Sequence, residues 1–272
     1  MPGTCSASPA TRGLVDSQKL VRGLLIRGLL AGLAAGVLMF VFAWVFGEPQ
    51  VDAAIRFEEA ANPPSSEAPL VSRDVQSTFG LLTGTIVFAV AVGGIFALVF
   101  AAVQGRIGHA RPRVTAATLA LVAFVVIVLV PFLKYPSNPP AVGADETIAY
   151  RTRIYFVMLL LSVVAAFAAL RVGRDAVKRF GAWNGVLVAV GSYLILVAIS
   201  QVLMPSLDEV PQGFSASVIW HFRIATLGTH AVLYATLGLA FGALAERWIT
   251  QATRGAADTY RTSNPSAGAL HP

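Results

Sequence analysis

Cysteine and charge are scarce in this 272-residue chain, and each shortage excludes a class of protein. Cys5 is the single cysteine, so the chain cannot build an internal disulfide framework or a thiolate metal cluster. Charged residues make up 12% of the chain, against roughly 25% in a soluble domain, whereas hydrophobic residues make up 56%. This composition is typical of a protein whose solvent is lipid.

Catalytic motifs and buried charges are missing as well. The sequence contains neither H-E-x-x-H nor G-x-S-x-G, the motifs of familiar metallohydrolases and serine hydrolases. Its long hydrophobic stretches contain no Asp, Glu, Lys or Arg, although proton relays, carboxylate-lined ion paths and voltage sensors need such groups at membrane depth. We therefore predict a protein that is not an enzyme, binds no permanent cofactor and is not a self-sufficient secondary transporter.

Six hydrophobic stretches define the fold class. Each approaches the roughly 20 residues that a helix needs to cross the hydrocarbon core, at about 1.5 Å per residue. Backbone groups find no water there, so helices are the expected spanning structure. The sequence predicts an all-α, polytopic integral membrane protein with a six-helix transmembrane bundle, whose helices cover residues 28–46, 79–103, 114–133, 154–170, 181–204 and 224–245.

Basic residues indicate the orientation. Most Lys and Arg residues lie in four segments, 1–27, 104–113, 171–180 and 246–272. Because Lys and Arg are retained on the cytoplasmic side, both termini are predicted to be cytoplasmic, the N-in/C-in arrangement. The formal net charge of +6 is then a topology signal and favours contact with lipid head groups over nucleic-acid binding.

Composition also divides the chain. Residues 1–20 are predicted to be a disordered cytoplasmic arm and residues 251–272 a disordered cytoplasmic tail, because neither has an apolar face to bury. Residues 21–250 form the predicted six-helix domain, a multi-pass protein of the cell inner (plasma) membrane.

Small residues and prolines predict how the helices pack and end. Glycines four residues apart allow close helix packing in lipid. They occur at Gly28, Gly32 and Gly36, at Gly80 and Gly84, at Gly181 and Gly185, and at Gly238 and Gly242. Prolines mark the outer ends of the first, third and fifth stretches, where we expect helices to end: Pro49, Pro131 followed by Pro136, and Pro205.

His230 is the one ionisable side chain within a predicted span, and it shares a helix face with Thr226 and Tyr234. At this depth it needs a hydrogen-bond partner or a metal, so a structural role and a role in ion passage both stay open. His221 lies nine residues earlier, roughly 13 Å away along a helix, so the two histidines cannot bind one ion together.

Acidic residues gather in the connecting segments predicted to face outward. Carboxylates suit divalent cations, and Asp52 and Glu59 would lie on one side of a helix with Arg56 between them. Glu58 is a further candidate in this segment. The alternative is an ordinary acidic surface set by topology.

Three passages resemble a known family: residues 48–59 with 71–76, KYPSNPPAVGADETIAYRT at 134–152, and WHFRIATLGTHAVLYATLGLAFG at 220–242. Over roughly residues 20–250 the chain resembles the CbtA family of cobalt transporter subunits, which is associated with cobalamin metabolism. The resemblance implies that cobalt is the transported ion and that the partner is CbtB, a small single-span subunit with a histidine-rich metal motif.

The resemblance adds candidate metal-contacting positions in the proline-containing segment. Tyr135, Asn138, Asp145 and Glu146 offer oxygen atoms there, and prolines reduce the cost of ordering them. The full predicted metal set is Asp52, Glu58, Glu59, Tyr135, Asn138, Asp145, Glu146, His221 and His230.

The sequence is compatible with two functions. The first is a membrane subunit of a cobalt, or other divalent-cation, uptake system. The second is a non-transporting scaffold or assembly subunit that holds another membrane protein through its glycine seams. The ligand types do not separate cobalt from nickel.

Overall fold

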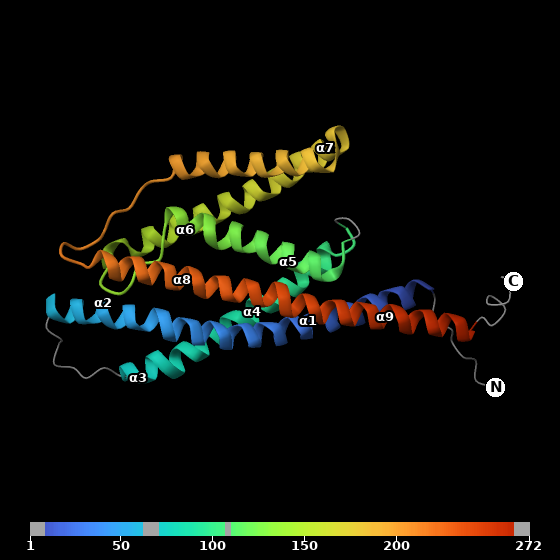
Figure 1. Ribbon diagram of the computed structural model, residues 1–272, viewed down its shortest axis with the longest axis horizontal. Coiled ribbons are helices and arrows are strands. Elements are labelled where there is room, and N and C mark those ends of the chain that lie inside the picture. Colours follow the sequence, from blue (N-terminus) through green and yellow to red (C-terminus); the bar gives the residue numbers. More distant parts are fainter. Residues whose placement is uncertain (1–8, 62–70, 107–109, 264–272) are drawn as a thin grey trace. The chain divides into compact units, whose positions relative to one another are not determined.

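The computed structural model describes residues 9–61, 71–106 and 110–263, and regular structure in these residues is helical throughout (Figure 1). The α-helices are α1 (Pro9–Phe42), α2 (Glu48–Ala61), α3 (Arg73–Val75), α4 (Leu81–Val103), α5 (Pro112–Ala123), α6 (Val130–Lys134), α7 (Ile148–Leu203), α8 (Ala216–Thr236) and α9 (Gly242–Ser263). Shorter helical turns join them: η1 (Ala43–Gly47), η2 (Gln76–Gly80), η3 (Phe124–Leu129), η4 (Asp145–Thr147) and η5 (Leu237–Phe241). The all-α prediction is confirmed for the described residues.

Five helical runs in these residues are long and apolar enough to cross a membrane. They are Gln18–Ala61, Arg73–Val103, Pro112–Lys134, Ile148–Leu203 and Ala216–Arg254. Four of them each contain one predicted span, whereas the 56-residue α7 contains both 154–170 and 181–204.

Gly181 divides α7 into two limbs. Its backbone has φ 84° and ψ 169°, a conformation that is essentially restricted to glycine. A Cβ on Gly173 would lie 2.6 Å from the Cβ of Ala189, and one on Gly185 would lie 2.8 Å from the Cα of Val177. These contacts are placed symmetrically about Gly181, so the limbs run antiparallel, as the returning ribbon of α7 shows (Figure 1).

The described helices belong to two compact units. Unit 1 comprises 1–38, 82–121 and 233–272, and unit 2 comprises 39–81 and 122–232. In unit 1, α1 and α4 approach through small residues: a Cβ on Gly28 would lie 2.5 Å from the carbonyl oxygen of Gly93, and one on Gly32 would lie 2.5 Å from that of Ala89. The buried ring of Phe241 packs edge-on against Phe96 and Phe100 in the same unit.

A buried polar contact in unit 2 joins both limbs of α7 to η3. The hydroxyl of Ser162, which is 1% exposed, donates to the carbonyl of Val126 at 2.7 Å. Ser162 has one hydrogen to donate, so the Tyr193 hydroxyl at 2.9 Å is the donor of the second bond. Around this contact lies an apolar cluster of Val130, Met158, Ala165 and Val197.

One of the three predicted proline stops is wrong. α6 ends at Lys134, directly before the predicted Tyr135-Pro136 pair. Pro205 does follow the end of α7, where Met204 becomes extended. Pro49 instead lies in the first turn of α2 and Pro131 in the first turn of α6, directly after the π-helical segments η1 and η3. A proline inside a continuous helical run cannot donate its hydrogen bond to the preceding turn, and the π-helical segment before each proline changes the hydrogen-bond pattern at that point.

The glycine predictions are confirmed in part. The Gly28, Gly32 and Gly36 seam and the Gly238 and Gly242 seam are confirmed as close contacts. A Cβ on Gly84 would meet nothing within 4 Å, so the predicted seam at Gly80 and Gly84 is wrong.

The predicted disordered ends lie partly outside the described residues. α1 begins at Pro9, within the predicted arm 1–20, and α9 continues to Ser263, within the predicted tail 251–272. Disorder of these ends stays a prediction.

Candidate functional site

Connecting segments of unit 2 meet on a small apolar cluster, which we call the segment junction. It consists of Ala54 from α2, Val142 from segment 135–147, and Phe214 and Ile219 around the start of α8. Phe57 packs edge-on against Phe214, with ring centroids 4.9 Å apart. The junction therefore fixes three connecting segments that are distant in sequence, and polar contacts surround it.

Arg73 bridges two carboxylates of α2. Its guanidinium forms an ion pair with Glu48, which is 14% exposed, and its Nε donates to Asp52 Oδ1 at 3.1 Å. Glu48 and Asp52 are four residues apart, so they lie on one face of the helix. These carboxylates hold α2 against the segment that leads into α4.

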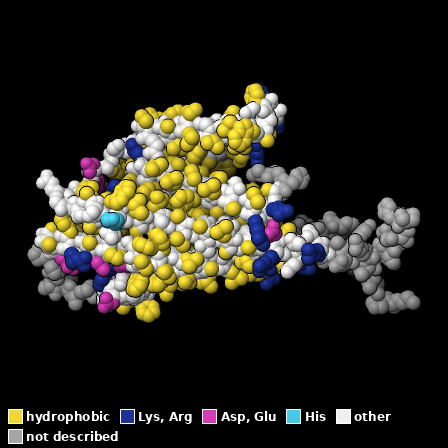
Figure 2. Space-filling view, in the orientation of Figure 1, with side chains coloured by type: hydrophobic (Ala, Val, Ile, Leu, Met, Phe, Trp, Pro, Cys, Tyr) yellow, Lys and Arg dark blue, Asp and Glu magenta, His cyan; other side chains and the backbone are white. Residues whose placement is uncertain are grey.

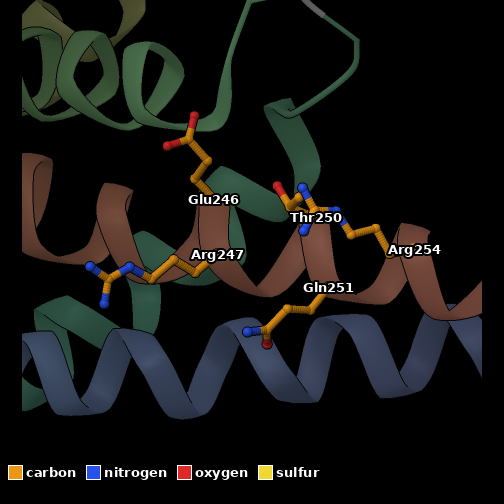
Figure 3. A pocket seen from close by; sticks show the side chains of 5 residues that line it. All are labelled: Glu246, Arg247, Thr250, Gln251 and Arg254. Carbon is orange, nitrogen blue, oxygen red and sulfur yellow. The ribbon is translucent and has the colours of Figure 1, made fainter.

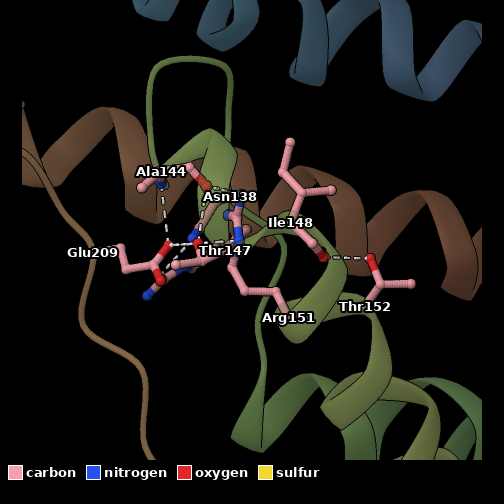
Figure 4. A network of polar contacts seen from close by, with 8 residues as sticks. Asn138, Ala144, Thr147, Ile148, Arg151, Thr152 and Glu209 are labelled. Atoms are coloured by element: carbon pink, nitrogen blue, oxygen red, sulfur yellow. Dashed lines mark hydrogen bonds and ion pairs between the residues drawn. The ribbon is translucent and has the colours of Figure 1, made fainter.

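Glu209 organises the segment before α7 (Figure 4). Its Oε2 accepts hydrogen bonds from the backbone N–H of Ala144 at 3.2 Å and from the Thr147 hydroxyl at 2.9 Å. The Nε of Arg151 lies 3.5 Å from the same oxygen, and a terminal nitrogen of Arg151 donates to the Ala144 carbonyl at 3.3 Å. One carboxylate thus ties segment 204–215 to the first turns of α7.

Three further side chains form hydrogen bonds that hold segment 135–147 and the adjoining end of α6 in place. Arg223 donates to Asn138 Oδ1 at 2.8 Å, Lys134 Nζ to the Gln201 carbonyl at 2.8 Å, and the Tyr135 hydroxyl to the Pro205 carbonyl at 2.8 Å. Burial, with a smaller contribution from Tyr150, raises the pKa of Tyr135 above its ordinary value. The phenol therefore keeps its proton and remains a donor.

A protein-family model described as "Probable cobalt transporter subunit (CbtA)" matches residues 21–246. This chain belongs to the CbtA family. The match covers all five apolar helical runs except their outermost residues, together with the segment junction. No curated protein and no solved structure matches the chain.

Family membership confirms the resemblance drawn from the three sequence passages. CbtA is a family of transporter subunits, and the word subunit implies a further component of a cobalt transport system. Together with the apolar helices, membership identifies this CbtA chain as a multi-pass membrane protein.

The predicted metal residues of this CbtA chain fall into different environments. Asp52 is bound by Arg73, Asn138 by Arg223, and Tyr135 by a backbone carbonyl, as described above. Glu58, Glu59, Glu146 and His221 are exposed, whereas the side chain of Asp145 lies outside the described residues. Among the described residues, no group of three or more His, Cys, Asp or Glu lies close enough to hold a metal ion.

His230 has the hydrogen-bond partner that its depth demands. Its Nδ1 lies 2.9 Å from the carbonyl oxygen of Thr226, one turn earlier in α8. The bond requires the proton on Nδ1, which leaves Nε2 as an acceptor in the neutral ring. A role in ion passage stays a hypothesis.

Sequence reasoning missed the pairing of acids with arginines. Arg73, Arg151 and Glu209 hold the connecting segments together, whereas the acidic residues alone had predicted a surface open to cations. The available signal was the presence of Arg73, Arg151 and Arg223 in those same segments. Which acid each arginine meets depends on contacts between residues 21 or more positions apart.

Proposed function

We propose that this CbtA-family chain is the membrane subunit of a cobalt, or other divalent-cation, uptake system in the cell inner membrane. The observation that carries the proposal is the family match across residues 21–246, which includes both the apolar helices and the segment junction. Cobalt is the substrate in this proposal and not a resident cofactor.

The proposed partner is a small single-span subunit with a histidine-rich segment. This chain has four histidines in all and no histidine-rich run, so a borderline metal ion would be captured by imidazoles that the partner supplies. The CbtA chain would then provide the membrane path and the surface that receives the ion.

For topology, we propose six membrane crossings with both termini in the cytoplasm. The antiparallel limbs of α7 support two crossings within that helix, and the basic segments support the orientation. Reporter fusions after residue 20 and after residue 254 are expected to show cytoplasmic activity, whereas a fusion in segment 62–70 is expected to show exterior activity. Opposite compartments for the two ends would refute the topology.

The uptake proposal predicts a loss of cobalt accumulation. A cell that lacks this chain but expresses the partner is expected to take up less radiolabelled Co²⁺ at limiting concentration, and the restored gene is expected to recover uptake. The same assay with radiolabelled Ni²⁺ separates the two metals, which share ligand preferences. Unchanged Co²⁺ uptake in the deleted strain would overturn the proposal.

Three exposed carboxylates are the proposed first contacts for the hydrated cation. Glu58, Glu59 and Glu146 are exposed, whereas Asp52 and Glu209 are occupied by arginines. Charge attracts a cation to such a surface and raises its association rate, an effect that salt screens. The variant carrying Glu58→Gln, Glu59→Gln and Glu146→Gln is expected to lower Co²⁺ uptake severalfold at low ionic strength, and less in high salt.

The matched control is Asp208→Asn, which removes an exposed acid beside the Glu209 contact. Equal uptake by the triple variant and the parent protein would rule out these residues as the receiving surface. It would leave the family-based proposal standing.

A further inference from the structure

A polar face of α9 follows the apolar part of the last candidate span. Arg247, Thr250, Gln251 and Arg254 recur at the i, i+3, i+4, i+7 spacing of one helical face. With Glu246 they line a shallow, open surface depression of about 270 Å³, in which Arg254 lies beside Thr250 (Figure 3). The Arg254 guanidinium and the Thr250 hydroxyl lie together there, whereas Arg247 extends along the helix away from Arg254 and Gln251 points toward α1.

The charge around this depression is strongly positive. Among the side chains described in unit 1, Glu246 is the acidic one, and it forms an ion pair with Arg113. Neither Arg247 nor Arg254 has an acidic partner within that described set. Basic side chains gather at this end of the unit (Figure 2), and those of unit 1 are Lys19, Arg22, Arg27, Arg106, Arg111, Arg113, Arg247 and Arg254.

Packing in unit 1 fixes the rotation of α9. The Trp248 ring lies against Gly23 of α1, and the Arg27 guanidinium stacks over the ring, 4.1 Å from its centroid. Arg27 is itself held by a hydrogen bond to the Gly23 carbonyl at 2.8 Å. Because Trp248 packs against α1 in this way, α9 is held at one rotation about its own axis. Its polar face therefore points in a fixed direction within unit 1.

The neighbouring surface suits an acyl chain. Leu239, about two turns before Arg247, is 72% exposed. A ligand with a charged head and an apolar tail would meet guanidinium groups at one end and apolar helix at the other.

We infer that this face of α9 binds the phosphate group of an anionic ligand, either the phosphodiester of an anionic membrane lipid or a free phosphate. The Arg254 guanidinium can donate paired hydrogen bonds to phosphate oxygens, the neighbouring Thr250 hydroxyl adds a donor, and Arg247 adds positive charge nearby. Basic pockets beside membrane helices bind lipid head groups by the same chemistry. The inference does not depend on cobalt transport, and its test contains no cobalt.

The lipid arm uses the full-length protein in nanodiscs made from equal amounts of phosphatidylglycerol and phosphatidylcholine. Native mass spectrometry measures which lipid stays bound to the protein after the protein is released from the nanodisc. The parent protein is expected to retain phosphatidylglycerol. The variant that carries both Arg247→Gln and Arg254→Gln is expected to bind phosphatidylglycerol about 25-fold more weakly, roughly fivefold per arginine. Arg106→Gln with Arg111→Gln removes equal charge from exposed positions of the same unit and is expected to retain the lipid.

The phosphate arm titrates inorganic phosphate into the same variants in phosphatidylcholine nanodiscs. Saturable binding that disappears in the Arg247 and Arg254 variant supports the site and assigns it to a soluble ligand. Unchanged binding of both phosphatidylglycerol and phosphate in that variant overturns the inference. Equal lipid loss in the Arg106 and Arg111 control overturns it too, because general charge would then explain the binding. Size-exclusion profiles of both variants verify that they fold.

Discussion

Replacing Gly93 by valine is expected to abolish folding of this protein. A Cβ at position 93 would collide with the carbonyl oxygen of Gly28 and lie 2.9 Å from the Cα of Gly32, so backbone and not a flexible side chain would have to move. Overpacking costs about 1–3 kcal/mol even where side chains can adjust, and separating two helices costs more. We expect little monodisperse protein in detergent by size-exclusion chromatography.

Gly84→Ala on the same helix is the matched control. A Cβ there meets nothing within 4 Å, and alanine favours a helix over glycine by roughly 0.5–1 kcal/mol. This variant is expected to match or slightly exceed the parent melting temperature. A Gly93→Val protein that elutes and melts like the parent would show that α1 and α4 do not need their close approach.

Replacing Glu209 by alanine is expected to give the second-largest effect. The change removes two hydrogen bonds and leaves Arg151, whose side chain is 27% exposed, without its carboxylate. Breaking a buried pair costs about 3–5 kcal/mol, and partial exposure lowers our expectation to about 2 kcal/mol. Thermal unfolding in detergent measures the loss, and Co²⁺ uptake should fall with it if segment 135–147 receives the ion.

The adjacent Asp208→Ala is the control, because Asp208 is exposed and a surface change is expected within about 0.5 kcal/mol. A double variant, Glu209→Ala with Arg151→Ala, should lose less than the two single changes together, since it leaves no unpaired charge. If Glu209→Ala melts like Asp208→Ala, the carboxylate does not hold the segments.

Sequence patterns succeeded where the cause is local. The glycine spacing at Gly28, Gly32 and Gly36 predicted a helix seam, because a four-residue repeat always places residues on one face. They failed at Pro49, where a π-helical segment immediately precedes the proline and the helix runs on. They also failed at Gly80 and Gly84, since spacing identifies a face but not whether another helix covers it.

The contacts of the candidate site were likewise not predictable from the sequence alone. Its acidic residues and the family passages are visible in the sequence, but the pairing of Asp52 with Arg73 and of Glu209 with Arg151 is not. Those pairs restricted the proposed receiving surface to three exposed acids of the predicted metal set, Glu58, Glu59 and Glu146.

The sequence by itself determined that this is an all-helical, multi-pass membrane protein of the CbtA family. The length of the hydrophobic stretches and the scarcity of charged residues can be read directly from the sequence. In lipid, few structures other than helices satisfy the backbone hydrogen bonds of such stretches. Only the tertiary structure decided that α7 folds back at Gly181, which arginine pairs with which carboxylate, and which face of α9 stays open beside Trp248. These features depend on contacts between segments far apart in sequence, which no local pattern encodes.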